Sequence, residues 1–203
     1  HKITNDSEIL KSLDWFKSRN EEQNNLEAPI IRKPFFCSGC PHNSSLKVPE
    51  GKRALGGIGC HYMAVDSIES TEFFTQMGGE GTPWIGIAPF SHEKHVFANL
   101  GDGTYKHSGI LAIRAALDAS VNITYKILYN DAVAMTGGQE IGSNWDVEGI
   151  VKQVLAEGVK KVSILSEDPK RYNHLVNNEV KSLHRDTIIT CLLYTSPSPR
   201  DNL

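Results

Sequence analysis

Two segments decide the fold of this chain: NLGDG at positions 99–103 and NDAVAMTGGQ at positions 130–139. An apolar run from Val96 leads into the first segment, an amphipathic run follows it, and a β-branched run at 123–129 leads into the second. This order is typical of a β-α-β unit, whose crossover is right-handed. The carboxyl ends of its two parallel strands then bring Asp102 and Asn130 together, at the edge where open α/β sheets bind ligands.

The residue types at this edge favour a phosphate and a divalent cation. Gly101 and Gly103 let backbone amides approach a phosphate closely, and the helix that follows offers its positive N-terminal end. Asp102 supplies a hard anionic oxygen for Mg²⁺, and Asn130 supplies a neutral one. The alternative is that Asp102 only caps the helix and Asn130 only ends a strand.

Three cysteines form a second candidate site. Cys37 and Cys40 are separated by two residues, and Cys60 comes after a further strand and turn. A glycine precedes both Cys40 and Cys60, so both loops can fold tightly and bring the thiolates to one metal centre. The residues alone leave three possibilities open: an iron–sulfur cluster, a zinc site completed by His61 or His42, and unliganded thiols.

Composition excludes several classes of protein. The 203 residues, 39% hydrophobic and 22% charged, suit one soluble globular domain with a sizeable core. A formal net charge of −3, without a long basic run, argues against a nucleic-acid surface. No apolar stretch is long enough for a membrane span and no signal-peptide pattern opens the chain, so we expect a cytoplasmic protein that does not contact membrane.

Strands alternate with helices along the chain, which predicts an α/β fold with a doubly wound, mostly parallel sheet. Besides the central unit, we expect helices at 7–18, 63–74, 147–157 and 168–183, and strands at 53–59, 84–88 and 161–165.

Four motifs in one order resemble the 2-oxoacid:ferredoxin oxidoreductases. They are FCSGCPH at 36–42, GIGCHYM at 57–63, QMGGEG at 76–81 and YNDAVAMTGGQ at 129–139. Within that family they are similar to the indolepyruvate branch, and more to its long fused-chain form than to its two-subunit form. The resemblance runs from about residue 34 to about residue 186 and implies a diphosphate-type domain that binds thiamine diphosphate through Mg²⁺.

The resemblance extends the set of cofactor-binding residues. By the family's pattern, the backbone carbonyl two residues after the Asn, that of Ala132, is the third protein ligand of Mg²⁺, beside Asp102 and Asn130. Gly137 and Gly138 would let the backbone wrap the diphosphate or the thiazolium side. The implied cofactor-binding residues are Gly101, Asp102, Gly103, Asn130, Ala132, Thr136, Gly137 and Gly138.

The resemblance also implies a [4Fe–4S] cluster next to the thiamine. Cys37, Cys40 and Cys60 match its first three ligands, and the fourth is missing from this chain. Glu80 is not assigned as the glutamate that activates the cofactor, because in thiamine enzymes that residue belongs to the separate pyrimidine-binding domain.

The implied reaction is oxidative decarboxylation of an aryl 2-oxoacid with coenzyme A, which gives an acyl-CoA, carbon dioxide and reduced ferredoxin. The implied partners are ferredoxin and the pyrimidine-binding domain of the same enzyme, in an oligomer, so the chain alone is expected to be inactive. No catalytic residue is assigned. Met135, His42 and His61 are candidates for substrate contact; pyruvate-specific relatives have an Asn where this chain has Met135.

Two other functions also fit parts of this sequence. One is a non-oxidative thiamine diphosphate decarboxylase or carboligase, which shares the diphosphate unit but needs no cluster. The other is a zinc-stapled module without catalysis.

The apolar spacing at 7–18, the polar segment at 19–25, which is expected to be a linker, and the limits of the resemblance predict three parts of the chain. Residues 1–33 form an N-terminal helix and linker, and residues 34–190 a thiamine diphosphate-binding domain, truncated at its C-terminus. Residues 191–203 resemble a translated sequencing adaptor, and we exclude them from the predicted fold. The alternative is a genuine Pro/Ser-rich flexible tail.

Overall fold

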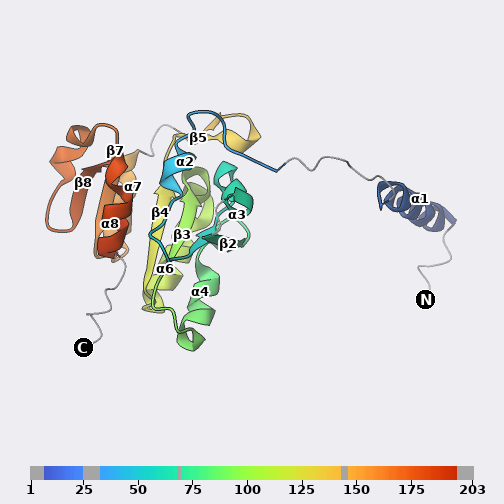
Figure 1. Ribbon diagram of the computed structural model, residues 1–203, viewed down its shortest axis with the longest axis horizontal. Coiled ribbons are helices and arrows are strands. Elements are labelled where there is room, and N and C mark those ends of the chain that lie inside the picture. Colours follow the sequence, from blue (N-terminus) through green and yellow to red (C-terminus); the bar gives the residue numbers. More distant parts are fainter. Residues whose placement is uncertain (1–6, 25–32, 68–69, 143–145, 196–203) are drawn as a thin grey trace. The chain divides into compact units, whose positions relative to one another are not determined.

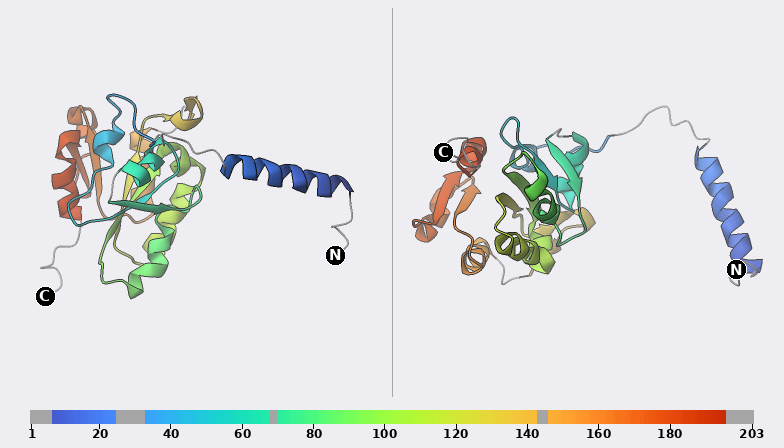
Figure 2. Two further views of the ribbon diagram at one scale, coloured as in Figure 1. Left: turned by 45° about the vertical axis from the view of Figure 1, so that its right-hand side comes forward. Right: turned by 90° about the horizontal axis from the view of Figure 1, so that it is seen from below.

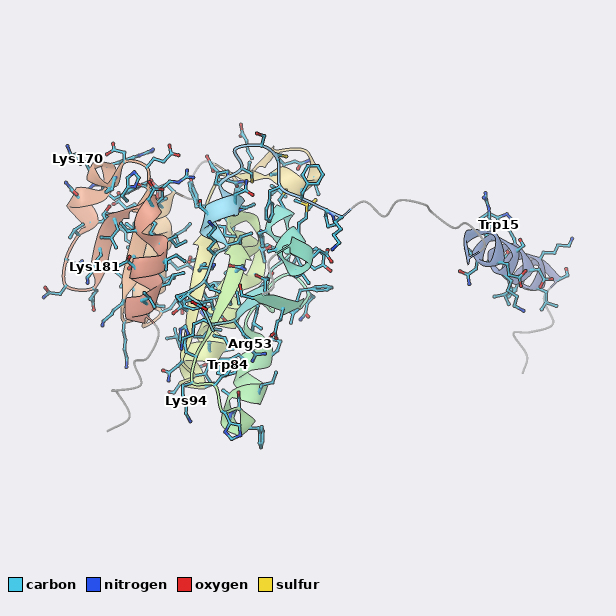
Figure 3. The ribbon with its side chains drawn as sticks, in the orientation of Figure 1. Trp15, Arg53, Trp84, Lys94, Lys170 and Lys181 are labelled. Atoms are coloured by element: carbon cyan, nitrogen blue, oxygen red, sulfur yellow. The ribbon has the colours of Figure 1, made fainter. Side chains whose placement is uncertain are left out.

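The computed structural model describes residues 7–24, 33–67, 70–142 and 146–195. The chain divides into two compact units, His1–Lys33 and Pro34–Leu203. In the first unit, α1 (Ser7–Asn24) is a single helix, so it continues through the polar segment that we expected to be a linker. Its Trp15 side chain (Figure 3) is exposed, and so is that of Phe16.

The second unit contains the remaining helices and all the described strands (Figure 1). Its α-helices are α2 (His42–Ser45), α3 (Ala64–Ser67), α4 (Thr82–Ile87), α5 (Asp102–Thr104), α6 (Ile110–Asp118), α7 (Val147–Ala156) and α8 (Ile188–Thr195). Its strands are β1 (Ala54–Gly56), β2 (Thr71–Phe74), β3 (Val96–Gly101), β4 (Ile123–Leu128), β5 (Ala132–Val133), β6 (Gln139–Glu140), β7 (Val162–Ser166) and β8 (Val180–His184). Short 3-10 helices span Cys60–Met63, Ala88–Phe90, Ala134–Thr136, Pro169–Leu175 and Arg185–Thr187, and a π-helical turn spans Tyr105–Gly109.

The central sheet has the strand order β2-β1-β3-β4, and all three of its pairings are parallel. A second parallel pair, β7 and β8, lies beside it in every view (Figures 1 and 2), while β5 and β6 form a small antiparallel pair. The predicted α/β fold with a doubly wound, mostly parallel sheet is confirmed. None of the helices in the described ranges is long and apolar enough to cross a bilayer.

Helices cover both faces of the central sheet, because successive side chains of a strand point to opposite sides. The side that carries Val96, Ala98 and Leu100, here called the apolar face, packs against α4, α6 and α7 through Trp84, Ile113 and Val154, among others. The opposite side carries Phe97, Asn99 and Lys126 and is here called the polar face. Its Phe97 packs against Leu192 and Ile188 of α8.

The strand expected at 84–88 is wrong, because this segment is the helix α4. The glycine loop ends at Gly81 with φ of 82°, and Pro83 lies in the first turn of the helix, where its fixed φ and missing N–H suit a helix start. The Trp84 indole donates a hydrogen bond of 3.0 Å to the carbonyl of Asn122 and is buried (Figure 3). The Thr-Pro pair was the sequence signal for this helix.

Two expected helices end early, and a strand follows within each predicted range. Within 63–74, the helical part ends with α3, and Thr71–Phe74 pairs with β1; its β-branched and aromatic residues favour a strand. Within 168–183, a 3-10 helix ends at Leu175 and β8 begins at Val180. The Asn177 side chain accepts hydrogen bonds from the amides of Glu179 and Val180, which makes the turn between them.

Part of the segment that we excluded from the fold lies in the structure. Residues 191–195 continue α8, and Cys191 and Leu192 are buried, with 7% and 4% of their surface exposed. Ile188 and Leu192 are four residues apart, so they share one helix face, and that face covers Phe97. Residues 196–203 lie outside the described ranges.

Candidate functional site

Asp102 and Asn130 meet at the carboxyl ends of β3 and β4. Gly101 pairs with Leu128 in the register of these strands, so the residues that follow share one edge of the sheet. The Asp102 carboxylate is 5% exposed, and its Oδ2 atom accepts hydrogen bonds of 2.7 Å from the amides of both Asn130 and Asp131. Asp102 therefore ties the end of β4 to the start of the helix after β3.

The hydrogen bonds leave one oxygen of Asp102 with spare capacity. Oδ1 accepts one bond, of 2.8 Å, from the amide of Gly103, whereas Oδ2 accepts two. A carboxylate oxygen has about two lone-pair sites, so Oδ1 is the atom that can still bind a cation. The assignment of Asp102, Asn130 and Ala132 as Mg²⁺ ligands stays a prediction.

The segment after Asn130 is an exposed, tightly hydrogen-bonded loop. Asp131 has φ of 59°, and the Asn130 side chain accepts a bond of 3.2 Å from the amide of Ala132. Thr136 and Gln139 exchange two hydrogen bonds, of 2.6 and 2.8 Å. Lys106 fixes the far end of this loop by donating to the carbonyl of Ile141.

Gly137 and Gly138, the two predicted wrapping glycines, have φ of 118° and 81°. These values lie in a region that L side chains rarely adopt, so glycine is required at both positions. Met135 precedes them and is 53% exposed. The loop therefore presents glycine backbone and one long apolar side chain outward, without a partner in the described residues that would bury them.

The turn from Cys37 to Cys40, here called the cysteine loop, leads into α2. The amide of Cys40 donates a bond of 3.0 Å to the carbonyl of Cys37, which closes a turn with Gly39 at φ of 72°. His42 follows in the first turn of α2, and its Nδ1 lies 3.3 Å from Ser45 Oγ. Burial lowers the pKa of His42, and the negative charge of Asp102 opposes that shift. The His42 ring therefore lies near Asp102, at the carboxyl edge of the sheet.

Cys60 joins the same region from the turn after β1. Burial raises the pKa of its thiol, and the negative charges of Cys40 and Cys37 raise it further. The structure therefore brings the three predicted cysteines within electrostatic reach of one another. Among the described residues, no three side chains of His, Cys, Asp or Glu form a group that would hold a metal ion.

His61 lies beneath this edge rather than on its surface. It is 4% exposed, and burial together with the nearby His42 lowers its pKa to about 4. The rings of His42 and His61 are 5.8 Å apart. A Cβ atom on Gly101 would lie only 3.0 Å from the His61 ring, and one on Gly57 only 2.6 Å from its Nε2 atom. Hence His61 fills the space that these glycines leave, and its contact with substrate stays a prediction.

Glu80 is internal, as a structural role requires. It is 1% exposed, and its Oε2 accepts a bond of 2.7 Å from the amide of Gly78. Burial raises the pKa of its carboxyl, and hydrogen bonds from backbone amides oppose that rise.

Two basic residues next to the cysteine loop were not predicted from the sequence. Lys126 lies on the polar face of β4, and Arg185 follows β8; both donate hydrogen bonds to residues 44–47. For Lys126 the available signal was a lysine inside the apolar strand ITYKIL at 123–128.

Comparison with known proteins identifies the family. The family described as "Thiamine pyrophosphate enzyme, C-terminal TPP binding domain" matches residues 57–165. This range includes β3, Asp102, β4 and the loop with Gly137 and Gly138.

Several relatives are named "Indolepyruvate oxidoreductase subunit IorA". The one from Thermococcus kodakarensis is 27% identical over 150 residues, which cover 64% of this chain and 23% of that protein. The one from Archaeoglobus fulgidus is 30% identical over 151 residues (65% and 24%), and the one from Methanothermobacter marburgensis is 26% identical over 145 residues (64% and 23%). The match thus spans about a quarter of the length of these relatives. With the family match covering more than half of the residues, this chain belongs to the C-terminal thiamine pyrophosphate-binding domains of the thiamine pyrophosphate enzymes.

Proposed function

We propose that this chain is the diphosphate-binding part of an enzyme that oxidatively decarboxylates an aryl 2-oxoacid, such as indolepyruvate. The products would be an acyl-CoA, carbon dioxide and reduced ferredoxin. The family membership supports the thiamine chemistry, and the printed names of the relatives support the indolepyruvate substrate. Coenzyme A, ferredoxin and a pyrimidine-binding domain, assembled in an oligomer, are the proposed partners.

The residues at the strand ends fit thiamine diphosphate with Mg²⁺. Asp102 Oδ1 would bind the cation, together with the Asn130 side chain and the Ala132 carbonyl, since Mg²⁺ prefers such hard oxygen ligands. Gly101, Gly103, Thr136, Gly137 and Gly138 would contact the cofactor's diphosphate and thiazolium side. The bound cofactor supplies the electron sink for the carbanion that decarboxylation leaves, while the protein binds and orients it.

The observation that carries the oxidative function is that Cys37 and Cys40 lie near enough to Cys60 for their charges to act on its thiol. Cys37, Cys40 and Cys60 would hold a [4Fe–4S] cluster, with a fourth ligand from elsewhere in the enzyme; such a cluster accepts single electrons. Burial raises the pKa of the Cys60 thiol, and the like charges of Cys40 and Cys37 raise it further; binding to a cationic centre would remove this repulsion. A non-oxidative decarboxylase or carboligase gives no reason for such a group.

Metal analysis tests this function against the zinc-stapled module. After anaerobic reconstitution with iron and sulfide, the purified chain should contain iron and acid-labile sulfide, and Cys60→Ser should contain less of both. Cys191→Ser is the matched control, because Cys191 is buried in α8. Zinc without sulfide in the protein as isolated, and no uptake of iron, would contradict the proposal.

Turnover of the complete enzyme separates the oxidative from the non-oxidative reading. We expect the chain alone to be inactive, because the pyrimidine-binding half of the site is elsewhere. The enzyme with its remaining domains should consume indolepyruvate only when coenzyme A and an electron acceptor are both present. Release of an aldehyde without an acceptor would favour the decarboxylase.

A further inference from the structure

The segment that follows the cysteine loop is held by a buried lysine. Lys126 is 8% exposed, and its ammonium donates hydrogen bonds of 3.1 Å to the carbonyl of Ser45 and 3.3 Å to that of Lys47. These carbonyls lie at the end of α2, where a helix leaves carbonyls without internal partners. The two contacts join β4 to a segment about 80 positions earlier in the chain.

Burying the amine of Lys126 at this position is energetically unfavourable. In the sheet register it lies opposite Asn99, which is fully buried. In the described part of the chain, no carboxylate forms an ion pair with it, and burial lowers the pKa of its amine to about 7. A buried amine is disfavoured unless its hydrogen bonds compensate, and here the acceptors are the carbonyls of the α2 segment.

A second cation reaches the same segment from the neighbouring sheet. Arg185 follows β8; its Nη2 lies 3.4 Å from Ser44 Oγ, while its Nη1 pairs with Glu167 at 2.5 Å. Ser44 Oγ in turn donates a bond of 3.0 Å to the carbonyl of Pro41. The contact of Arg185 therefore leads to the residue directly after Cys40.

We propose that Lys126 and Arg185 are positioning residues that fix residues 41–47 and thereby orient the Cys37–Cys40 turn and His42 at the carboxyl edge of the sheet. In this role they would set the geometry of the cluster, so this inference rests on the proposed function. Lys126 would act through its contacts with backbone carbonyls at the end of α2, and Arg185 through its contact with the Ser44 hydroxyl.

Hydrogen exchange of the whole chain tests the positioning without any cluster. Loss of a hydrogen-bonding partner should speed exchange of the amides at 43–47 about fivefold in Lys126→Met, and by a smaller factor in Arg185→Gln. Amides of β7 should not change. The controls are Lys160→Met, at an exposed turn, and Arg114→Gln, which removes a comparable arginine–glutamate pair with Glu157.

Unchanged exchange at 43–47 in Lys126→Met would overturn the proposal, and so would equal acceleration throughout the chain. If Lys126→Met does not fold, Arg185→Gln decides: it must speed exchange at 43–47 relative to Arg114→Gln, and failure to do so overturns the proposal.

A spectroscopic measurement tests the consequence for the cluster. After reconstitution and reduction, the electron paramagnetic resonance spectrum of Arg185→Gln and Lys126→Met should differ from that of the unaltered chain, while both controls keep its line shape. An identical spectrum in all five proteins would contradict a role in cluster geometry. If the unaltered chain takes up no iron, the proposed cluster fails, and the exchange experiment alone judges the positioning.

Discussion

The two faces of the central sheet are built from different kinds of residues. On the apolar face, Leu100 packs with Tyr105, Ile113, Ile150 and Val154, and helices with clear apolar periodicity cover it. On the polar face, Phe97 and Ala54 pack against α8, but buried Asn99 and Lys126 lie next to them. One face is therefore a core, and the other is also a support for the cysteine loop.

The ionisable groups follow the same division. On the apolar face, burial raises the pKa of Tyr105 to about 12, and that of Tyr125 above its usual range. On the polar side, burial lowers the pKa of His95 to about 4 and that of Lys126 to about 7. Burial disfavours the charged form in each case, so all four groups are neutral more readily than in water. The tyrosines are neutral at pH 7 in any case, whereas the polar face depends on pH.

The largest effect, a loss of cofactor binding, is expected from substitutions at the carboxyl ends of β3 and β4. In the complete enzyme, Asp102→Ala should abolish Mg²⁺-dependent binding of thiamine diphosphate, because the cation loses its one charged protein ligand. Asn130→Ala should weaken binding less. Calorimetric titration measures both; an unchanged affinity in Asp102→Ala would refute the magnesium assignment.

Shortening a side chain on the apolar face should lower the free energy of unfolding more than shortening one on the surface. Leu100→Ala should lower the free energy of unfolding by about 2–5 kcal/mol, the usual cost of a large cavity in a core. Leu111→Ala, on the exposed side of α6 with 57% of Leu111 accessible, is the control and should change stability little. Urea unfolding gives both values, and similar losses in the two variants would mean that this face is not the core.

A fall in pH should lower the stability of the folded chain through a buried histidine on the polar face. His95 is 5% exposed, and its Nε2 lies 2.8 Å from Thr124 Oγ1. Its pKa is lower in the folded state, so the unfolded state takes up the proton first as the pH falls from 6.5 toward 4, and stability is lost in that window. The shift corresponds to a loss of about 3 kcal/mol at most.

His95→Gln removes this proton uptake and should flatten the fall in unfolding free energy between pH 7 and pH 4, measured in urea at several pH values. Part of the fall remains, because His61 has a similarly lowered pKa. An unaltered pH slope in His95→Gln would show that this ring is not buried as a neutral base.

The smallest effect concerns Met135, which belongs to neither face. If it lines the substrate pocket of the complete enzyme, Met135→Asn should lower kcat/KM for indolepyruvate about tenfold, in line with differences in apolar pockets. Its thioether favours an aromatic ring, so pyruvate should be affected less, and cofactor affinity should be unchanged. Equal losses for pyruvate and indolepyruvate would place Met135 in the scaffold.

Local sequence determined the central unit of this protein. β3, β4 and α7 were predicted within a few residues, because apolar periodicity and the glycine turns report directly on local structure. The meeting of Asp102 and Asn130 followed from the same pattern, since parallel strands end at a common edge. Where two readings of a short segment compete, as in α4, β2 and β8, sequence reasoning failed, because pairing with β1 or β7 and burial of Trp84 decided the outcome.

Tertiary structure alone decided the polar face. Nothing near Lys126 in the sequence predicts that its ammonium binds the carbonyls of Ser45 and Lys47, or that Leu192 covers Phe97. A periodic pattern specifies which side of an element is buried. The partner of a buried polar group, in contrast, depends on which distant segment reaches it, and that is fixed only when the chain packs.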